Sequence, residues 1–217
     1  MARLVIFDMD GVLADTESSW VYVHRHFGVS NDHSLYAYLR GEIGDLEFIR
    51  RDVALWRQKD PGITANRIDE ILDEVPLMRG ARETISRLRE GGYRTAIVSA
   101  GIDLLAQRIV RELKIDAHLA NGFVQDKDGR LSGEGVLRVS LMDKGDAVEE
   151  TGRSMGIHKK DIVSVGNSQY DVSMFRKSGF GIAFRPSDPK VREMADAVVE
   201  GNDLSEIVEI IDSRAHR

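Results

Sequence analysis

Short apolar runs that end in polar residues recur along the chain. The three clearest runs span residues 4–7, 95–98 and 161–165. Continuous apolar runs of this length are typical of strands buried on both faces, as in a parallel sheet. They lead into Asp8, Ser99 and Asn167. Because the carboxyl ends of parallel strands joined by helical crossovers lie at one edge of a sheet, we expect these three residues to meet there.

Between residues 17 and 75 the apolar spacing is helical, and no convincing strand pattern occurs. Two apolar stripes recur at helical spacing. Their residues are Leu46, Ile49, Val53 and Trp56 in the first, and Ile68, Ile71, Leu72 and Val75 in the second. Thr64 is a predicted N-cap for the second helix, and Pro61-Gly62 separates the two. The stripes fit the core of a small bundle and a substrate lid equally well.

The remainder of the chain alternates helical and strand patterns. Helices are predicted at 81–90, from 102 to 113 and at 144–155, and short strands at 181–184 and 198–199. Asp128-Gly129 between apolar residues predicts a hairpin. The pattern predicts an α/β fold with a doubly wound, mostly parallel sheet. Its core would comprise residues 1–15 and 77–217, and a helical cap of residues 16–76 would follow the first strand.

Composition narrows the class of protein. Of the 217 residues, 42% are hydrophobic and 30% charged, which predicts a globular chain with a sizeable core. The absence of cysteine excludes disulfides and thiolate chemistry. The net charge of −6, with scattered Lys and Arg, argues against a nucleic-acid partner. The apolar runs are too short for a signal peptide or a membrane span, so we expect a cytoplasmic protein. The six histidines show no metal-site spacing.

Asp8 and Asp10 are the first candidates for chemistry. They bracket one residue just beyond the first predicted strand, and Gly11 lets the backbone bend there. Two carboxylates turned toward one point repel each other unless a cation or a proton intervenes. This predicts a hard metal such as Mg²⁺, a raised pKa, or both. The alternative is that Asp8 caps a turn and Asp10-Gly11 is an ordinary loop.

Ser99, Lys144, Asn167 and Asp171 extend this candidate site. Ser99 between a strand and a helix predicts an anion site, although it also fits a helix N-cap. Lys144 at a helix start is disfavoured by the helix dipole, which suggests a function, while a solvated Lys is the alternative. Asn167 and Asp171 offer oxygen ligands for Mg²⁺ together with Asp8, or a cap and a first-turn acid.

Together these residues suit phosphoryl transfer, which needs a nucleophile, a charge clamp and a metal. Asp8 would attack phosphorus to form an aspartyl-phosphate. Asp10, protonated, would donate to the leaving alcohol and then deprotonate the attacking water.

Four segments resemble, in order, the motifs of the haloacid dehalogenase superfamily. They are Asp8-Met9-Asp10-Gly11-Val12, Ser99, Lys144, and Gly166-Asn167-Ser168-Gln169-Tyr170-Asp171. The resemblance spans nearly the whole chain, and within the superfamily it is greatest to phosphoserine phosphatases. It implies a Mg²⁺-dependent phosphatase with Asp8 and Asp10 as catalytic residues. It also implies Asp8, Asp10, Asn167 and Asp171 as metal ligands, and Ser99, Ala100, Gly101, Lys144 and Tyr170 as substrate-binding residues.

Four positions depart from that family pattern. Gly11-Val12 replaces Ser-Thr, Ala100 replaces Gly, Asn167 replaces a metal-binding Asp, and Tyr170 replaces an Asn that contacts substrate. The family also holds its substrate with a Glu and an Arg. The resemblance assigns these roles to Glu17, nine residues after Asp8, and to Arg50, with Arg51 as its competitor.

We therefore expect a phosphatase for a small phosphomonoester, with phosphoserine as the first candidate substrate. Glu17 would bind its ammonium and Arg50 its carboxylate. The alternatives are a phosphatase or mutase for another small organic phosphate, or a phosphate-binding relative without turnover. We expect no nucleic-acid or membrane partner, and the choice between monomer and homodimer stays open.

Overall fold

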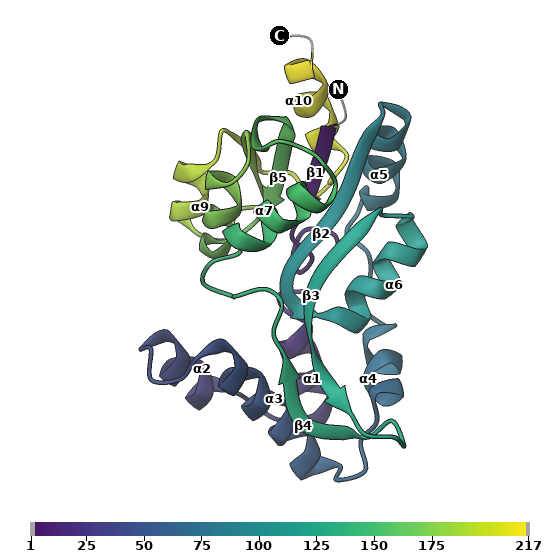
Figure 1. Ribbon diagram of the computed structural model, residues 1–217, viewed down its shortest axis with the longest axis vertical. Coiled ribbons are helices and arrows are strands. Elements are labelled where there is room, and N and C mark those ends of the chain that lie inside the picture. Colours follow the sequence, from purple (N-terminus) through teal and green to yellow (C-terminus); the bar gives the residue numbers. More distant parts are fainter. Residues whose placement is uncertain (1–2, 216–217) are drawn as a thin grey trace.

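The computed structural model describes residues 3–215, and a seven-stranded sheet runs through this part of the chain (Figure 1). The strand order is β4-β3-β2-β1-β5-β6-β7, and every neighbouring pair is parallel except β3 and β4. The strands are β1 (Arg3–Phe7), β2 (Tyr93–Ile102), β3 (Ala117–Gln125), β4 (Leu131–Val136), β5 (Ile162–Gly166), β6 (Phe180–Phe184) and β7 (Ala197–Val199). The predicted mostly parallel α/β sheet is confirmed.

Strand β1 lies in the middle of the sheet and is buried on both faces. The side chains of Leu4, Val5, Ile6 and Phe7 are 0% exposed. Because side chains alternate along a strand, Val5 and Phe7 enter one hydrophobic cluster, and Leu4 and Ile6 enter another on the opposite face. Each such side chain contributes about 1.5–3 kcal/mol on burial, so this apolar run fixes β1 at the centre.

Helices cover both faces of the sheet. Ile85, Leu105 and Ile207 place α5, α6 and α10 in the cluster of Val5. Val148 and Val191 place α7 and α9 in the cluster of Leu4. Helix α8 contributes to the same cluster. These helices are α5 (Ala81–Glu90), α6 (Asp103–Leu113), α7 (Gly145–Ser154), α8 (Val172–Arg176), α9 (Pro189–Met194) and α10 (Glu206–Ala215). The doubly wound arrangement is therefore present, with single 3-10 turns at Lys159–Asp161 and Gln169–Asp171.

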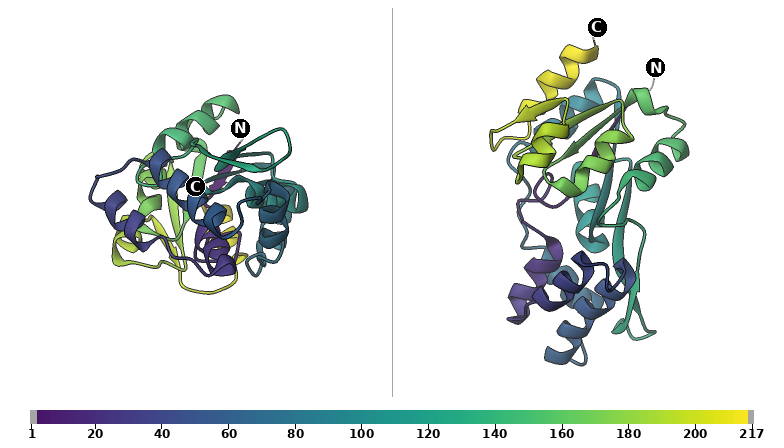
Figure 2. Two further views of the ribbon diagram at one scale, coloured as in Figure 1. Left: turned by 90° about the horizontal axis from the view of Figure 1, so that it is seen from below. Right: turned by 90° about the vertical axis from the view of Figure 1, so that its left-hand side faces the viewer.

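Four helices form the end of the molecule that lies away from both chain termini (Figures 1 and 2). They are α1 (Ser19–Phe27), α2 (Asp32–Leu39), α3 (Asp45–Lys59) and α4 (Ala65–Leu72). Thr64 caps α4, since its hydroxyl accepts a hydrogen bond from the backbone N–H of Arg67 at 3.3 Å. The predicted helical character of this segment and the predicted helix N-cap at Thr64 are confirmed.

The β3–β4 hairpin extends from the sheet and packs against these helices. The backbone N–H of Leu131 donates to the carbonyl of Ile63, and that of Ala65 to the carbonyl of Gly129, each at 3.0 Å. The predicted turn at Asp128-Gly129 is present, with Gly129 at φ +79°. In space the hairpin therefore adjoins the helical end, although the sequence-based division assigns it to the core.

One boundary differs from its prediction. Strand β2 continues through Ser99 to Ile102, and α6 begins only at Asp103. Ser99 is therefore not a helix N-cap. A register shift between Val98 and Ile102 marks an irregular segment in the strand, and this turns the residues around Ser99 out of regular pairing. None of the helices within residues 3–215 has the length and apolar character of a membrane span.

Candidate active site

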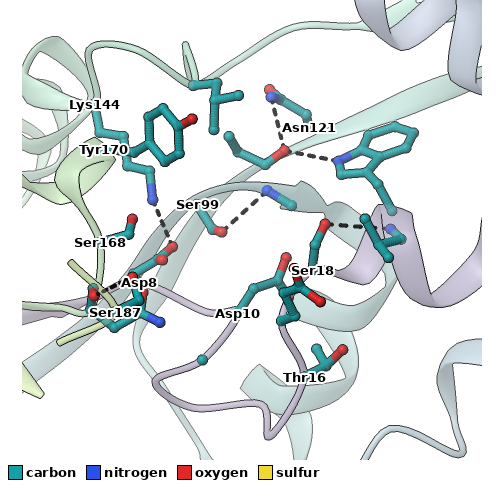
Figure 3. Close-up of a pocket in the computed structure, with 18 of the residues that line it drawn as sticks. Asp8, Asp10, Thr16, Ser18, Ser99, Asn121, Lys144, Ser168, Tyr170 and Ser187 are labelled. Atoms are coloured by element: carbon teal, nitrogen blue, oxygen red, sulfur yellow. Dashed lines mark hydrogen bonds and ion pairs between the residues drawn. The ribbon is translucent and has the colours of Figure 1, made fainter. Parts of the chain in front are cut away.

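The carboxyl ends of β1, β2 and β5 meet at one edge of the sheet, as predicted, and line a cavity of about 680 Å³ between the sheet and the helices α1, α2 and α3. Asp8, Asp10, Ser99, Lys144 and Tyr170 all contribute to its lining (Figure 3). Four more residues that the sequence assigns to the site also line the cavity, namely Glu17, Ala100, Gly101 and Asn167. Tertiary structure thus brings together residues from four separate parts of the sequence.

Asp8 follows directly on β1 and is fixed by its backbone. Its N–H donates to the carbonyl of Val165 in the neighbouring strand at 2.9 Å. The side chain is buried, and the Lys144 ammonium lies 2.9 Å from Asp8 Oδ1. The same ammonium lies 2.7 Å from Asp171 Oδ1. One buried cation therefore holds two buried carboxylates, and Lys144 has the charge-balancing position that its unfavourable helix location suggested.

Burial raises the pKa of Asp8 to about 7. The neighbouring carboxylate of Asp171, and to a smaller extent that of Asp10, raises the same pKa, while the Lys144 ammonium lowers it. Burial lowers the pKa of Lys144, but the carboxylates of Asp171 and Asp8 outweigh burial and leave that pKa above its ordinary value. Lys144 is therefore a permanent cation, while Asp8 titrates near neutral pH.

Asp10 lies in the loop that follows Asp8 and has one oxygen engaged and one free. Its Oδ2 accepts hydrogen bonds from the backbone N–H and from the hydroxyl of Ser19, both at 2.9 Å. Its Oδ1 is buried and makes no hydrogen bond within residues 3–215. Burial raises the pKa of Asp10, against these two hydrogen bonds. A raised pKa suits a carboxyl group that donates a proton.

Ser19 is a residue that the sequence did not single out. Besides its hydrogen bonds to Asp10, its hydroxyl accepts from the backbone N–H of Ile102 at 2.9 Å, and its side chain is fully buried. It therefore ties the start of α1 both to Asp10 and to the irregular end of β2. A serine at a helix start was a weak signal in the sequence, because capping alone explains such a residue.

Two glycines bring the loops close together. A Cβ on Gly101 would lie 2.7 Å from Asp10 Oδ2 and 2.6 Å from Met9 Cε. Gly11 has φ +78°, and a Cβ there would lie 2.2 Å from Asn167 Nδ2. Only glycine permits these approaches, so the β1 loop, the β2 end and the β5 loop form one wall.

Ser99 is buried beside this wall, and its hydroxyl accepts from the backbone N–H of Gly101 at 3.2 Å (Figure 3). The Ala100 carbonyl accepts from the indole N–H of Trp20 at 3.0 Å and from the Asn121 amide at 3.3 Å. Asn121 also bonds the backbone of Val139 and is a second supporting residue that the sequence did not indicate. These contacts hold the Ser99 segment in place against the cavity.

Asp171, which the sequence predicts as a metal ligand, lies outside the cavity lining. It is fully buried. Its Oδ1 faces Lys144, and its Oδ2 accepts from the backbone N–H groups of Asn167 and Ser168 at 2.9 and 3.0 Å. Ser168 is the N-cap of the following turn, in a capping box with Asp171. Both oxygens are thus engaged by the protein, and Asp171 positions Lys144 and the Asn167 loop.

The oxygen atoms left for a hard cation belong to Asp8, Asp10 and Asn167. The orphaned, buried Oδ1 of Asp10 calls for either a nearby cation or a proton of its own, since a buried carboxylate oxygen without a partner is otherwise unfavourable. Within residues 3–215 no group of three or more His, Cys, Asp or Glu residues is arranged to hold a metal. The set is two carboxylates and an amide, which suits Mg²⁺ with water completing its shell.

The two residues predicted to hold the substrate's charged groups lie in different places. Glu17 lines the cavity and pairs with Arg25 at 2.8 Å, with both side chains largely exposed. Arg50 does not line the cavity, because it points toward the hairpin and pairs with Glu134 at 2.8 Å. Arg51 pairs with Glu47 at 2.9 Å and does not line it either. The structure therefore brings only Glu17 to the site.

The site lies at the edge of a doubly wound sheet and combines a buried carboxylate, a lysine that pairs with it, and a second carboxyl group of raised pKa. This combination is that of a phosphoryl-transfer enzyme. The family model of haloacid dehalogenase-like hydrolases matches residues 5–176, and the chain belongs to this family, as a phosphatase. It is 32% identical over 214 residues to the phosphoserine phosphatase of Methanocaldococcus jannaschii, covering 96% of this chain and 97% of that protein.

Two further comparisons agree. The chain is 31% identical over 209 residues to the phosphoserine phosphatase of Wolinella succinogenes, covering 95% of this chain and 98% of the relative. Among solved structures, a phospho-aspartyl intermediate analogue of phosphoserine phosphatase superposes with a TM-score of 0.81 at 29% identity. It covers 96% of this chain and 98% of that one. The resemblance inferred from the four sequence motifs is confirmed.

Proposed function

We propose that this phosphatase hydrolyses a small phosphomonoester through an aspartyl-phosphate on Asp8. One observation carries the proposal. Asp8 lies buried at the cavity wall, 2.9 Å from the ammonium of Lys144, in the same cavity as Ser99 and the free oxygen of Asp10. This is a nucleophile beside a fixed positive charge, with a hydroxyl donor and a proton donor at hand.

In the first step an Asp8 oxygen attacks phosphorus, and the bond between phosphorus and the ester oxygen breaks. The departing oxygen takes the electron pair together with the proton of Asp10, and the alcohol leaves. In the second step Asp10 takes a proton from water, whose oxygen attacks phosphorus. The bond to Asp8 breaks, which releases inorganic phosphate and restores both carboxyl groups.

The other residues position these groups. Lys144 holds Asp8 and offers positive charge to the phosphoryl oxygens, while Asp171 holds Lys144. The hydroxyl of Ser99 and the nearby backbone N–H of Ala100 are donors for the same oxygens, while the N–H of Gly101 holds the Ser99 oxygen. A Mg²⁺ ion held by Asp8 and Asn167 would neutralise negative charge at the phosphoryl group and leave the free oxygen of Asp10 to carry the proton.

Phosphoserine is the substrate that the relatives' names suggest. The resemblance assigns the ammonium to Glu17, which lines the cavity, and the carboxylate to Arg50, which lies outside the cavity. The test is release of inorganic phosphate from p-nitrophenyl phosphate and from O-phosphoserine with Mg²⁺ present. We expect release in both cases and none from Asp8→Asn. Absence of release from both substrates by the folded wild-type protein would refute the proposal.

A further inference from the structure

The helical wall of the cavity carries acidic residues and no cation. Glu17, Asp45 and Asp52 line it there, and no Lys or Arg from the helical segment does so within the described chain. The cations among the described lining residues, Lys144 and Arg185, come from the core. Lys144 is engaged by Asp8 and Asp171, and Arg185 lies at an exposed position, 3.1 Å from Asp15. The leaving-group side of the cavity is therefore electronegative.

Asp52 is the buried acid of this wall with an oxygen that accepts no hydrogen bond from the described residues, whereas Glu17 is largely exposed and pairs with Arg25. It lies on α3, is 2% exposed and lines the cavity. Its Oδ1 accepts a hydrogen bond from the amide of Asn31 at 3.0 Å. No described residue donates a hydrogen bond to its Oδ2. Asp45 is different, because Tyr38, Ser140 and the backbone of Leu141 all donate to it, which makes Asp45 a structural acceptor.

A buried polar chain fixes the orientation of Asp52. The indole N–H of Trp56 donates to His24 Nδ1 at 2.8 Å, so a neutral His24 carries its proton on Nε2. That nitrogen lies 3.4 Å from Asp52 Oδ1 and has no hydrogen-bond partner in the described structure. Asn31 and His24 both face Oδ1, and this leaves Oδ2 as the oxygen available to a molecule in the cavity.

The carboxylate of Asp52 lines the cavity, and no cation within the described chain is placed at its Oδ2, so a cation on a bound ligand would be attracted to this oxygen. Aromatic Trp20 and Phe48 line the same cavity, and the faces of aromatic rings attract cations. An alkylammonium group fits this combination of an acid and aromatic rings. A carboxylate on the same ligand would face the like charges of Glu17, Asp45 and Asp52 in this wall, with no Lys or Arg of the described helical segment there to pair with, which is disfavoured.

We propose that the substrate is a phosphomonoester of a small amino alcohol that carries an ammonium group and lacks a carboxylate, and that Asp52 binds the ammonium. This inference rests on the proposed phosphatase function and specifies its leaving group. It departs from phosphoserine at one chemical group, the carboxylate.

Three substrates separate these groups in the wild-type enzyme. O-Phosphoethanolamine has the ammonium alone, O-phosphoserine has the ammonium and the carboxylate, and propyl phosphate has neither. With Mg²⁺ present, we expect kcat/KM for phosphoethanolamine to exceed the values for both others by about tenfold or more, the usual discrimination by a buried charged partner. Equal or faster hydrolysis of phosphoserine would overturn the inference and leave the phosphatase function intact. Failure on all three and on p-nitrophenyl phosphate would refute the function itself.

Variants test the assignment to Asp52. Asp52→Asn keeps an acceptor for Asn31 but removes the charge, so the ratio of kcat/KM for phosphoethanolamine to that for propyl phosphate should fall about tenfold or more. Glu47→Gln on the same helix is the matched control, because Glu47 is half exposed and does not line the cavity; its ratio should stay at the wild-type value. An unchanged ratio in Asp52→Asn would show that Asp52 only supports the helices. If Asp52→Asn does not fold, the wild-type substrate comparison decides.

Discussion

Replacing Asp8 by Asn removes the proposed nucleophile and also a buried negative charge, so activity and stability should change in opposite directions. Turnover should fall by several orders of magnitude, because loss of one member of a catalytic unit disables it. The fold should become more stable above neutral pH. Asn is similar in size, and Lys144 keeps its contact with Asp171 at 2.7 Å.

The size of the stabilisation follows from the pKa of Asp8. Burial raises that pKa from 3.8 to about 7. Between these two pH values the folded protein holds a proton on Asp8 that the unfolded chain has released. The free energy of unfolding therefore falls as the pH rises from about 4 to about 7, by up to about 4 kcal/mol from this group. Asn stays neutral at every pH and avoids that loss.

The assay is urea denaturation of both proteins with a metal chelator present, at pH 5 and at pH 8. We expect the difference in the free energy of unfolding between Asp8→Asn and wild type to grow in favour of the variant from pH 5 to pH 8. A difference independent of pH would refute the assignment of a raised pKa to Asp8. Near-normal turnover in the folded variant would refute the covalent mechanism. Beryllofluoride with Mg²⁺ should bind to wild type and fail to bind to Asp8→Asn.

Three further outcomes are expected. Asn167→Asp adds a negative charge to the proposed metal ligands and should tighten Mg²⁺ binding in calorimetry, whereas an unchanged affinity would place Asn167 outside the ligand set. Lys144→Met leaves two buried carboxylates unpaired and should lower the free energy of unfolding by about 3–5 kcal/mol in urea titrations. Lys177→Met, which breaks an exposed pair with Glu149, should cost far less because water screens that pair, and equal costs for the two lysines would contradict this. Arg50→Lys should leave the hydrolysis of phosphoserine and p-nitrophenyl phosphate unchanged, since Arg50 pairs outside the cavity; a selective loss on phosphoserine would return it to the site.

The sequence alone determined the sheet and the group of residues at its edge. Uninterrupted apolar runs are stable only when both faces of a strand are covered, so the runs before Asp8, Ser99 and Asn167 had to be central parallel strands. Parallel strands joined by crossovers end at one edge, and this was enough to predict that Asp8, Ser99 and Asn167 line one cavity. Local chemistry also determined the cap at Thr64 and the turn at Asp128-Gly129.

Only the tertiary structure decided which charged side chains reach the cavity and which are engaged elsewhere. The family resemblance suggested Arg50, but the hairpin packs on its side of α3 and supplies Glu134 as its partner. Asp171 pairs with Lys144 and holds it in place. Asp52 lines the cavity and presents a free oxygen to it. A charged side chain takes the partner that packing brings within a few ångströms, and such partners come from segments distant in the sequence. Helical spacing fixes which face of a helix is apolar, but it does not fix what that helix packs against.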